Sequence, residues 1–599
     1  MGAVSSLASF LTNLWWYKVC GIVGYIGRRE AAPIIVEGLK KLEYRGYDSF
    51  GVATISGGIE LDKHQGRISD SSSSAINLKG KIGIGHTRWA THGVPNDVNA
   101  HPHMDCSNHI AVVHNGIIEN YSALKHQLIS RGHIFRSETD TEVIAHLIEE
   151  AYESEMDLLS AVQKVVPKLT GSYALLVIAM GEDRIIAARY ASPLVLGVGD
   201  GEFFAASDMM PILDYTERAM YLEDGDIASI SQGNAEIFHE GKPVKRPVEL
   251  INWSQEDTKK GGFPHYMLKE IYEQPQAFYN SVRAITGETL PAPIRNPESV
   301  VVIACGSSYN AGLIFKYLLE DSCAIPVQLD FASEFKYFPP PIRGLVIGIS
   351  QSGETADTIS ALKQAKVHNC TTLAITNVLG SSISRSTDFT LFMRAGPEIS
   401  VAATKSFISQ LAVLMQIINF IRDGEFEEVL RNGHRAIEEV LLMDLSEAVE
   451  LCRNARSIFY VGRGPFYPVS LEGALKMKEI SYIHAEGYAA GELKHGPFAL
   501  LSPETPVVAI CMPGETYGVM ISNIKEMKAR GAPVIALGEE GDSELPEVVD
   551  IFIPLPQTPP FVQVLTSLVV QQLLAYYTAV GLNRDVDKPR NLAKSVTVE

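Results

Sequence analysis

The chain has 599 residues, 46% of them hydrophobic and 20% charged, a composition typical of folded globular domains and not of disordered segments. A single core seldom grows beyond about 250–300 residues, so this length predicts several domains. The net charge of −19 argues against a general nucleic-acid binder, because phosphate contacts need clustered Lys and Arg, and no nucleic-acid partner is expected.

Residues 1–19 differ in composition from the sequence that follows. They are rich in Ser and contain two of the four Trp residues, and they lack the basic start and the small-residue cleavage site of a secretory signal. We therefore expect 1–19 to be an extension that is absent from the mature protein.

From Cys20 to residue 240 the hydrophobic pattern predicts an α+β domain rich in antiparallel strands. Strands are expected at 20–27, 51–55, 82–86 and 110–114, and helices at 30–42 and 140–152. Six histidines fall within 86–114. None belongs to a helical His-x-x-x-His pair or a carboxylate-flanked pair, so the sequence predicts no metal site.

Five motifs mark this domain in order: Cys20-Gly-Ile-Val-Gly, YRGYDS (44–49), HTRWATHG (86–93), HNGIIEN (114–120) and SETDTE (137–142). The series resembles the class II glutamine amidotransferases, which are N-terminal-nucleophile hydrolases. In that family a Cys thiolate attacks the side-chain amide of glutamine, with the α-amine of the same residue as base. The resemblance implies a nucleophile at Cys20, oxyanion donors at Asn115 and Gly116, glutamine contacts at Arg88, Thr91, His92 and Asp140, and an ammonia-channel gate at Trp89.

Cys20 is preceded by 19 residues, so its nitrogen is an amide and not the amine that this mechanism requires. Either a propeptide is removed, or translation begins at position 19, where a valine codon serves as a start. We favour the second explanation, because 1–18 resembles no propeptide and removal of the initiator Met would expose Cys20.

Residues 241–262 alternate charge with Pro and Gly and are predicted to form a linker. The next segment, 264–278, is predicted to be an amphipathic helix that ends near Pro275 and docks on the following domain. The apolar run at 411–421 contains two amide side chains and is too short to cross a bilayer, so it predicts a buried helix, and no membrane partner is expected.

An internal repeat occupies the rest of the chain. Residues 299–312 align with 456–469, 345–359 with 507–521, and 371–377 with 532–538. Each copy has the order strand, Gly-rich turn, helix, strand, polar turn, helix. This order predicts two α/β domains, 263–440 and 441–588, with parallel sheets and ligands beyond the carboxyl ends of the strands, followed by a tail at 589–599.

The two copies differ in their polar residues. The first has hydroxyl-rich turns at 305–310 and 350–355, which suit a phosphate. The second has a charged segment at 471–497. A helix over 468–483 puts Glu472, Lys476 and Glu479 on one face, with His484, Glu486, Glu492, Lys494 and His495 in a following loop. A solvated helix face is the alternative, but interleaved Ala and Gly favour a reactive site.

The two copies resemble tandem sugar-isomerase (SIS) domains, and the domain order from Cys20 to Glu599 resembles the family of isomerising glutamine–fructose-6-phosphate aminotransferases. The resemblance implies an α+β glutaminase domain followed by two α/β SIS domains. It also implies that L-glutamine is hydrolysed, that ammonia passes internally to fructose 6-phosphate to give glucosamine 6-phosphate, and that the enzyme is a homodimer that needs no cofactor and no metal.

Roles for the SIS residues follow from the same resemblance. The sugar phosphate is expected at Ser308, Ser350, Gln351, Ser352 and Thr355, ring opening at His495, imine formation at Lys594, and proton transfer between C1 and C2 at Glu479, with Lys476 and Glu472 beside it. Two alternatives are another class II amidotransferase and a sugar-phosphate sensor. After residue 262 we find neither a nucleotide motif nor a basic helix-turn-helix.

The seven cysteines lie far apart without Cys-x-x-Cys spacing, and an odd number cannot pair completely within one chain. This pattern predicts reduced thiols and a cytoplasmic location.

Overall fold

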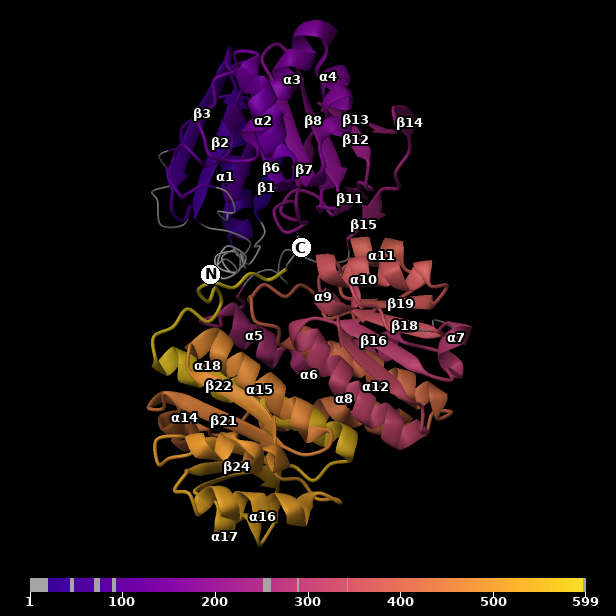
Figure 1. The fold of residues 1–599 in the computed structure, drawn as a ribbon, viewed down its shortest axis with the longest axis vertical. Helices are drawn as coiled ribbons and strands as arrows, with labels where there is room; N and C mark the ends of the chain where they lie inside the picture. Colours follow the sequence, from indigo (N-terminus) through magenta and orange to yellow (C-terminus); the bar gives the residue numbers. More distant parts are fainter. Residues whose placement is uncertain are drawn as a thin grey trace, which may run out of the picture. The chain divides into compact units, whose positions relative to one another are not determined.

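The computed structural model describes residues 20–43, 48–68, 76–88, 93–251, 260–287, 290–341 and 343–595 (Figure 1). The chain divides into two compact units, one of residues 1–255 with 595–599 and one of residues 256–594. The first unit holds the predicted amidotransferase domain, and the second holds both predicted SIS domains.

The first unit is built from antiparallel strands and four α-helices among the residues that the structure describes. The strands are β1 Gly21–Ile26, β2 Ser49–Ile55, β3 Ile59–Gln65, β4 Ile82–Arg88, β5 His103–Met104, β6 Ile110–Ile118, β7 Gly171–Ala179, β8 Arg184–Tyr190, β9 Val195–Val198, β10 Phe203–Ala206, β11 Arg218–Tyr221, β12 Asp226–Ser231, β13 Asn234–His239, β14 Lys242–Val244 and β15 Glu249–Leu250. The helices are α1 Ala31–Leu42, α2 Tyr121–Ser130, α3 Glu142–Glu155 and α4 Leu158–Val165.

These strands form two sheets that pack face to face. The orders are β15-β11-β9-β10-β1-β4-β2-β3 and β14-β13-β12-β8-β7-β6-β5. Ile22 and Ile84 of the first sheet share one buried cluster with Val113 and Leu176 of the second. Helix α1 packs on β1 and β4, while α3 packs on β6 and α4 on β8. The predicted α+β domain with antiparallel strands is confirmed.

Two short strands lie within the segment that the sequence predicts as a linker. Lys242–Val244 pairs with β13, and Glu249–Leu250 pairs with β11. Both strands are at sheet edges. Lys and Pro are common on edge strands because they discourage further pairing, so an edge strand and a linker have similar compositions.

The second unit contains two parallel sheets with the same topology. Its elements are α5 Tyr266–Tyr272, α6 Gln274–Ala284, α7 Ala292–Arg295, β16 Val300–Ala304, α8 Gly306–Cys323, β17 Val327–Phe331, α9 Ala332–Phe335, β18 Leu345–Ile349, α10 Ala356–Val367, β19 Thr371–Thr376, α11 Ser382–Ser386, β20 Phe389–Phe392, α12 Lys405–Ile421, α13 Glu427–Val440, α14 Ser446–Arg453, β21 Ser457–Gly462, α15 Phe466–Ser481, β22 His484–Ala489, the 3-10 helices η4 Ala490–His495 and η5 Pro497–Leu500, β23 Val507–Ile510, α16 Tyr517–Lys528, β24 Val534–Glu539, α17 Leu545–Val548, β25 Ile551–Leu555 and α18 Pro560–Gly581. The sheet orders are β17-β16-β18-β19-β20 and β22-β21-β23-β24-β25. The predicted repeat is confirmed, because its three aligned segments become β16 and β21, β18 and β23, and β19 and β24.

Each sheet is buried on both faces, which explains its continuous apolar strands. In β16, Val300 and Val302 point into one core while Val301 and Ile303 point into another. Residues of both SIS domains, such as Phe315 of α8 and Tyr460 of β21, belong to the same core cluster, so the two domains form one compact unit.

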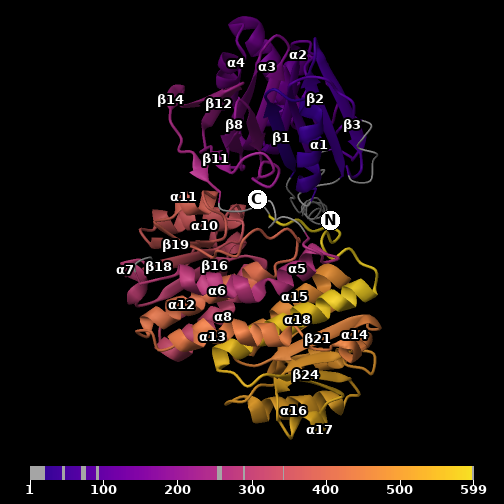
Figure 2. The ribbon, with the colours of Figure 1, turned by 180° about the vertical axis from the view of Figure 1, so that it is seen from behind.

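Two long apolar helices belong to this core. The predicted buried helix at 411–421 is the greater part of α12, which is confirmed. Within the described residues, α18 is the one helix long and apolar enough to cross a membrane, and 83% of its apolar window is buried inside the structure, as in a core helix. Helices α15 and α18 lie side by side (Figure 2).

Two local predictions are wrong. The segment 264–278 is not one helix: Pro275 lies in the first turn of α6, where a missing N–H costs no hydrogen bond. His484 and Glu486 do not lie in a loop but on β22, an edge strand paired with β21. An edge strand keeps one side in solvent, so its polar sequence resembles that of a loop.

Candidate active sites

The first candidate site forms where the two sheets of the first unit meet. Cys20 directly precedes β1, and the antiparallel register pairs Gly21 with Thr87, which brings Cys20 next to Arg88 at the end of β4. Asn115 comes from β6 of the facing sheet, and its Nδ2 donates a 2.8 Å hydrogen bond to the carbonyl oxygen of Cys20. Three predicted residues from two sheets therefore meet.

His86 fixes the orientation of the Asn115 side chain. Burial, together with the Arg88 charge, lowers the pKa of His86 to about 3, so its ring is neutral at physiological pH. The ring Nε2 lies 3.1 Å from Asn115 Oδ1 and 3.0 Å from the His114 carbonyl oxygen, both acceptors, so Nε2 carries the proton. Asn115 consequently turns its NH2 group toward Cys20.

Gly116, the second predicted oxyanion donor, has a backbone that only glycine adopts easily. Its φ is +122°, and a Cβ atom there would lie 2.1 Å from the carbonyl oxygen of Ser172. The close passage of β7 thus requires glycine at this position.

Arg88 and Asp140 supply opposite charges in the same site. Arg88 is buried, and its Nη2 donates a hydrogen bond to the Gly93 carbonyl oxygen at 3.2 Å. Burial lowers the pKa of Arg88, while Cys20, Asp140 and Asp48 act in the opposite direction. Asp140 Oδ2 accepts a 2.9 Å hydrogen bond from the backbone N–H of Ile118, the last residue of HNGII. The predicted residues Trp89, Thr91 and His92 lie outside the described residues.

Three further histidines tie the motifs together, a role that sequence reasoning missed. The rings of His86 and His101 stack with their centroids 4.1 Å apart. His103 Nε2 lies 3.0 Å from Thr139 Oγ1, and His114 Nδ1 lies 2.9 Å from Thr141 Oγ1. They connect the strands to the loop before α3. Their grouping in the motifs at 86–114 was the available signal.

The second candidate site joins the two SIS domains. Glu472 of α15 accepts hydrogen bonds from Ser307 Oγ and Asn310 Nδ2 of α8, both at 2.8 Å. Lys476 Nζ lies 2.6 Å from Glu479 Oε2 and 3.3 Å from Glu472 Oε1. The side chains of Glu472 and Lys476 are each 1% exposed, which excludes the alternative of a solvated helix face. Ser307 and Asn310 were not predicted.

Burial and charge act against each other in this network. Burial raises the pKa of Glu472, and Lys476 partly offsets this. Burial alone would lower the pKa of Lys476, but Glu472 and Glu479 raise it well above its ordinary value. Lys476 is therefore a fixed ammonium, and Glu479, 19% exposed, is the more accessible of its two carboxylate partners.

A hydroxyl-rich loop follows β18, as the sequence predicts. Ser350 Oγ lies 2.8 Å from Thr355 Oγ1 and accepts a 3.1 Å hydrogen bond from the Gly353 backbone N–H. The Ser352 hydroxyl accepts from the Glu354 N–H at 3.2 Å, and Gln351 is half-buried beside it. Thr355 is the N-cap residue of α10.

Ser308 lies in the first turn of α8, directly after the neighbouring strand β16, and its Oγ accepts a 3.1 Å hydrogen bond from Gln410 Nε2. Strands β16 and β18 are adjacent, and the chain order reverses between them. Ligands of such sheets bind at this switch point, where two helix N-termini attract an anion.

Lys594 is buried against an acidic pair that sequence reasoning missed. Its Nζ contacts Glu398 Oε2, and the two side chains are 6% and 0% exposed. Burial raises the pKa of Glu398, but Lys594 and hydrogen bonds from Ser406 bring it to about 2. Burial and repulsion from Glu398 raise the pKa of Glu270 to about 7. A lone carboxylate between Pro397 and Ile399 was the available signal.

His495 is exposed on η4. Across the described part of the chain, it makes no hydrogen bond or ion pair with Glu472, Lys476 or Glu479. The structure of a single chain therefore does not bring this predicted residue to the α15 network.

Two family models match the chain. The glutamine amidotransferase domain matches residues 86–214, and the SIS domain matches residues 293–420 and 451–581. Fold, site geometry and family models together define the class: a glutamine amidotransferase domain fused to two SIS domains.

Curated relatives identify the family within this class. Glutamine–fructose-6-phosphate aminotransferases (isomerising) of Methanosarcina acetivorans and Thermus thermophilus are 47% and 45% identical to this chain, over 97% of it and 100% of each relative. The chain belongs to the family of isomerising glutamine–fructose-6-phosphate aminotransferases.

Solved structures are similar over the second unit. The C-terminal domain of the Francisella tularensis glucosamine-fructose-6-phosphate aminotransferase is 34% identical, with a TM-score of 0.51, and covers 55% of this chain and 100% of that chain. A putative phosphosugar isomerase from Silicibacter pomeroyi is 25% identical, with a TM-score of 0.50, over 54% and 100% of the two chains.

Proposed function

We propose that this protein hydrolyses L-glutamine and uses the ammonia to convert fructose 6-phosphate into glucosamine 6-phosphate. One observation carries the proposal: a single chain of this family holds both Cys20, whose carbonyl oxygen accepts a hydrogen bond from Asn115, and the buried Lys594 of the second unit. Cys20 is a nucleophile with an oriented oxyanion donor beside it, and Lys594 is an amine next to domains of the sugar-isomerase fold.

In the glutaminase half, the Cys20 thiolate attacks the amide carbon of glutamine, and ammonia leaves with formation of a thioester. Water then cleaves the thioester, which releases glutamate and restores the thiol. The amide of Asn115 and the backbone N–H of Gly116 stabilise the oxyanion, and the fixed orientation of Asn115 supports this role because preorganised donors need no rearrangement. Arg88 binds the α-carboxylate and Asp140 the α-ammonium. We assign Thr91 and His92 to the same pocket and Trp89 to the gate of the ammonia channel.

In the sugar half, Ser308, Ser350, Gln351, Ser352 and Thr355 hold the phosphate. His495 assists ring opening, and the Lys594 amine then adds to C2 and forms an imine with loss of water. The Lys594 nitrogen must first leave its contact with Glu398, because the same nitrogen has to reach C2 of the sugar. Substrate binding is expected to separate this pair.

Glu479 moves the proton between C1 and C2 after ammonia has replaced Lys594 at C2. Its partial exposure and its 2.6 Å contact with Lys476 support this role, since a general base must be reachable by the substrate and held in a fixed position. Glu472 anchors Lys476 from the other side. No cofactor is required for either half-reaction.

We infer that the protein works as a cytoplasmic homodimer. The exposed η4–η5 segment supports self-association, because it carries His495 and the apolar side chain of Leu500, which is 63% exposed. Light scattering of the purified chain tests the dimer, for which a monomer at micromolar concentration is the contrary result.

Product analysis with amide-labelled glutamine and fructose 6-phosphate tests the proposal. The expected result is glucosamine 6-phosphate with the label at the C2 nitrogen, in amounts equal to the glutamate formed. Binding of the sugar phosphate without turnover would instead identify a sensor, and labelled ammonia with no amino sugar would identify a glutaminase with another acceptor.

A further inference from the structure

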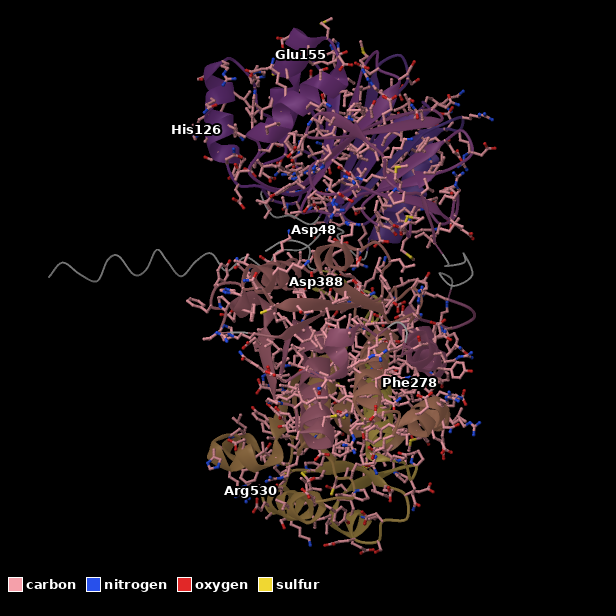
Figure 3. All side chains as sticks on the ribbon, turned by 90° about the vertical axis from the view of Figure 1, so that its right-hand side faces the viewer. Asp48, His126, Glu155, Phe278, Asp388 and Arg530 are labelled. Atoms are coloured by element: carbon pink, nitrogen blue, oxygen red, sulfur yellow. The ribbon has the colours of Figure 1, made fainter. Side chains whose placement is uncertain are left out.

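A second polar cluster lies in the first unit, away from the residues used above. It consists of Cys106 in the turn between β5 and β6, His133 after α2, and His146 and Glu149 on α3. Their ligand atoms all lie within 4.8 Å of one another. Figure 3 labels His126 on α2 and Glu155 at the end of α3, the two helices that border this cluster.

Four of the six distances between the ligand atoms match the edges of a coordination tetrahedron. Cys106 Sγ lies 3.5 Å from His133 Nδ1 and 3.5 Å from His146 Nδ1. Glu149 Oε2 lies 3.0 Å from His133 Nδ1 and 3.2 Å from His146 Nδ1. Zinc bonds of about 2.3 Å to sulfur and about 2.0–2.2 Å to nitrogen and oxygen, at tetrahedral angles, give edges of about 3.5 Å and about 3.3 Å.

The outer nitrogens of both histidines face carboxylates. His133 Nε2 lies 3.2 Å from Glu150 Oε1, and His146 Nε2 lies 3.7 Å from Glu142 Oε1. Glu150 is within hydrogen-bonding distance of His133, so it can hold the proton on Nε2 and turn the Nδ1 lone pair inward, as in metal-bound histidines. At His146 the carboxylate is too distant for a hydrogen bond, and Nε2 has no hydrogen-bond partner among the described residues. With both Nδ1 atoms unprotonated, two nitrogen lone pairs, a sulfur and a carboxylate oxygen converge on one point, where a cation would relieve their repulsion.

We propose that Cys106, His133, His146 and Glu149 bind one Zn²⁺ ion. A thiolate with two imidazoles selects zinc over the hard cations Mg²⁺ and Ca²⁺, and one thiolate with one carboxylate neutralises its two charges. Four protein ligands leave no open position, so the site is structural and not catalytic. The sequence had predicted no metal site, because the ligands come from three separate segments.

The zinc site holds the loop that carries Asp140. Glu142, which faces His146, also accepts hydrogen bonds from the backbone N–H groups of Arg136 and Ser137, both at 2.7 Å. Zinc therefore ties the β5–β6 turn, α3 and this loop together at one point.

Metal analysis of the full-length protein tests the proposal. After expression with added zinc and dialysis against metal-free buffer, we expect about one zinc per chain. Cys106→Ala and His133→Ala are expected to lose it. Cys323→Ala, which removes a partly exposed thiol of the second unit, and His126→Ala on α2 are the matched controls and are expected to keep it. A parent protein without zinc, or full zinc in both ligand variants, would overturn the proposal.

A cobalt spectrum keeps the test decisive if the ligand variants do not fold. Zinc is removed from the parent protein with a chelator and replaced by Co²⁺ alone. The expected spectrum has the strong visible bands of tetrahedral cobalt and a thiolate-to-cobalt charge-transfer band. A spectrum without the charge-transfer band would show that Cys106 is no ligand and would overturn the site.

Discussion

At the scale of single residues, the second unit contains two buried clusters of charged side chains, one around Lys476 and one around Lys594. They differ in how many carboxylates each lysine contacts. Lys476 forms an ion pair with each of its two carboxylate partners, Glu472 and Glu479. Glu398 and Glu270 are two carboxylates near Lys594, but only Glu398 forms an ion pair with it. The pKa of Glu398 is therefore lowered to about 2, while that of Glu270 is raised to about 7. When two buried carboxylates share one counterion, the pKa of one is lowered and the pKa of the other is raised.

The pKa of Glu270 predicts a pH dependence of stability. It is about 7 in the folded chain against an ordinary 4.5, so the folded state binds this proton more tightly than the unfolded state. The contribution of Glu270 to stability is fully present below about pH 4.5 and is lost as the pH rises through 7. Glu270→Gln mimics the protonated acid and should stabilise the protein relative to the parent at pH 8 but not at pH 5, by on the order of 1–3 kcal/mol.

Denaturant unfolding at both pH values, followed by circular dichroism, measures this difference. Glu428→Gln, which changes an exposed glutamate on α13, is the control and should show no such pH dependence. If Glu270→Gln changed the free energy of unfolding equally at pH 5 and pH 8, the raised pKa assigned to Glu270 would be contradicted.

Lys476→Met should be strongly destabilising because it leaves Glu472 and Glu479 without their counterion. Removing one partner of a buried ion pair costs about 3–5 kcal/mol. Lys494→Met is the matched control: Lys494 pairs with Glu526 at 2.8 Å, but both side chains are exposed, and such pairs contribute about 0–1 kcal/mol. Equal losses of unfolding free energy in the two variants would refute the buried network.

At the scale of elements, the loop between β18 and α10 depends on one glycine. Gly353 has a φ of +65°, and a Cβ atom there would lie 2.3 Å from Ser381 Oγ. The loop can close only because this side chain is absent, and its closure brings the hydroxyls of Ser350 and Thr355 together.

Gly353→Ala is therefore expected to raise the KM for fructose 6-phosphate by about tenfold or more, since each tenfold corresponds to about 1.4 kcal/mol. The glutaminase activity, which belongs to the first unit, should not change. Gly424→Ala is the control, because its φ is +88° with no atom within 4 Å of an added Cβ. A similar rise in KM for both variants would mean that backbone strain alone, and not the loop, is responsible.

At the scale of the whole molecule, the two chemistries belong to separate compact units. Cys20→Ala should abolish glutamine-dependent synthesis and leave sugar isomerisation measurable.

Lys594→Ala should retain basal glutaminase turnover and lose borohydride trapping of the sugar. Equal loss of both activities in either variant would contradict this separation, and trapping that persists without Lys594 would direct attention to Lys476.

The nitrogen of Cys20 makes a prediction about the mature protein. A chain that begins at Cys20 has a free amine as base, whereas a chain that retains 1–19 has an amide there and should hydrolyse glutamine about 10²–10⁴-fold more slowly. Glutaminase assays of both forms, with intact mass to verify each N-terminus, measure the difference. Equal rates would refute the role given to the Cys20 amine.

The sequence by itself determined the class of fold, the repeat and most of the proposed catalytic residues. Strand and helix periodicity, Gly-containing turns and motifs such as HNGIIEN are local, so they can be read without knowing what packs against them. The internal repeat, whose two copies begin around β16 and β21, predicted two parallel sheets because its pattern of strands, turns and helices is also local.

Only the tertiary structure decided which charges share a buried site. Lys594 meets Glu398 across 196 residues, Glu472 meets Ser307 across 165, and Cys106 meets His146 across 40. The energy of a buried charge depends on the partners and solvent around it, and these are set when distant segments pack. No spacing in the sequence encodes that arrangement.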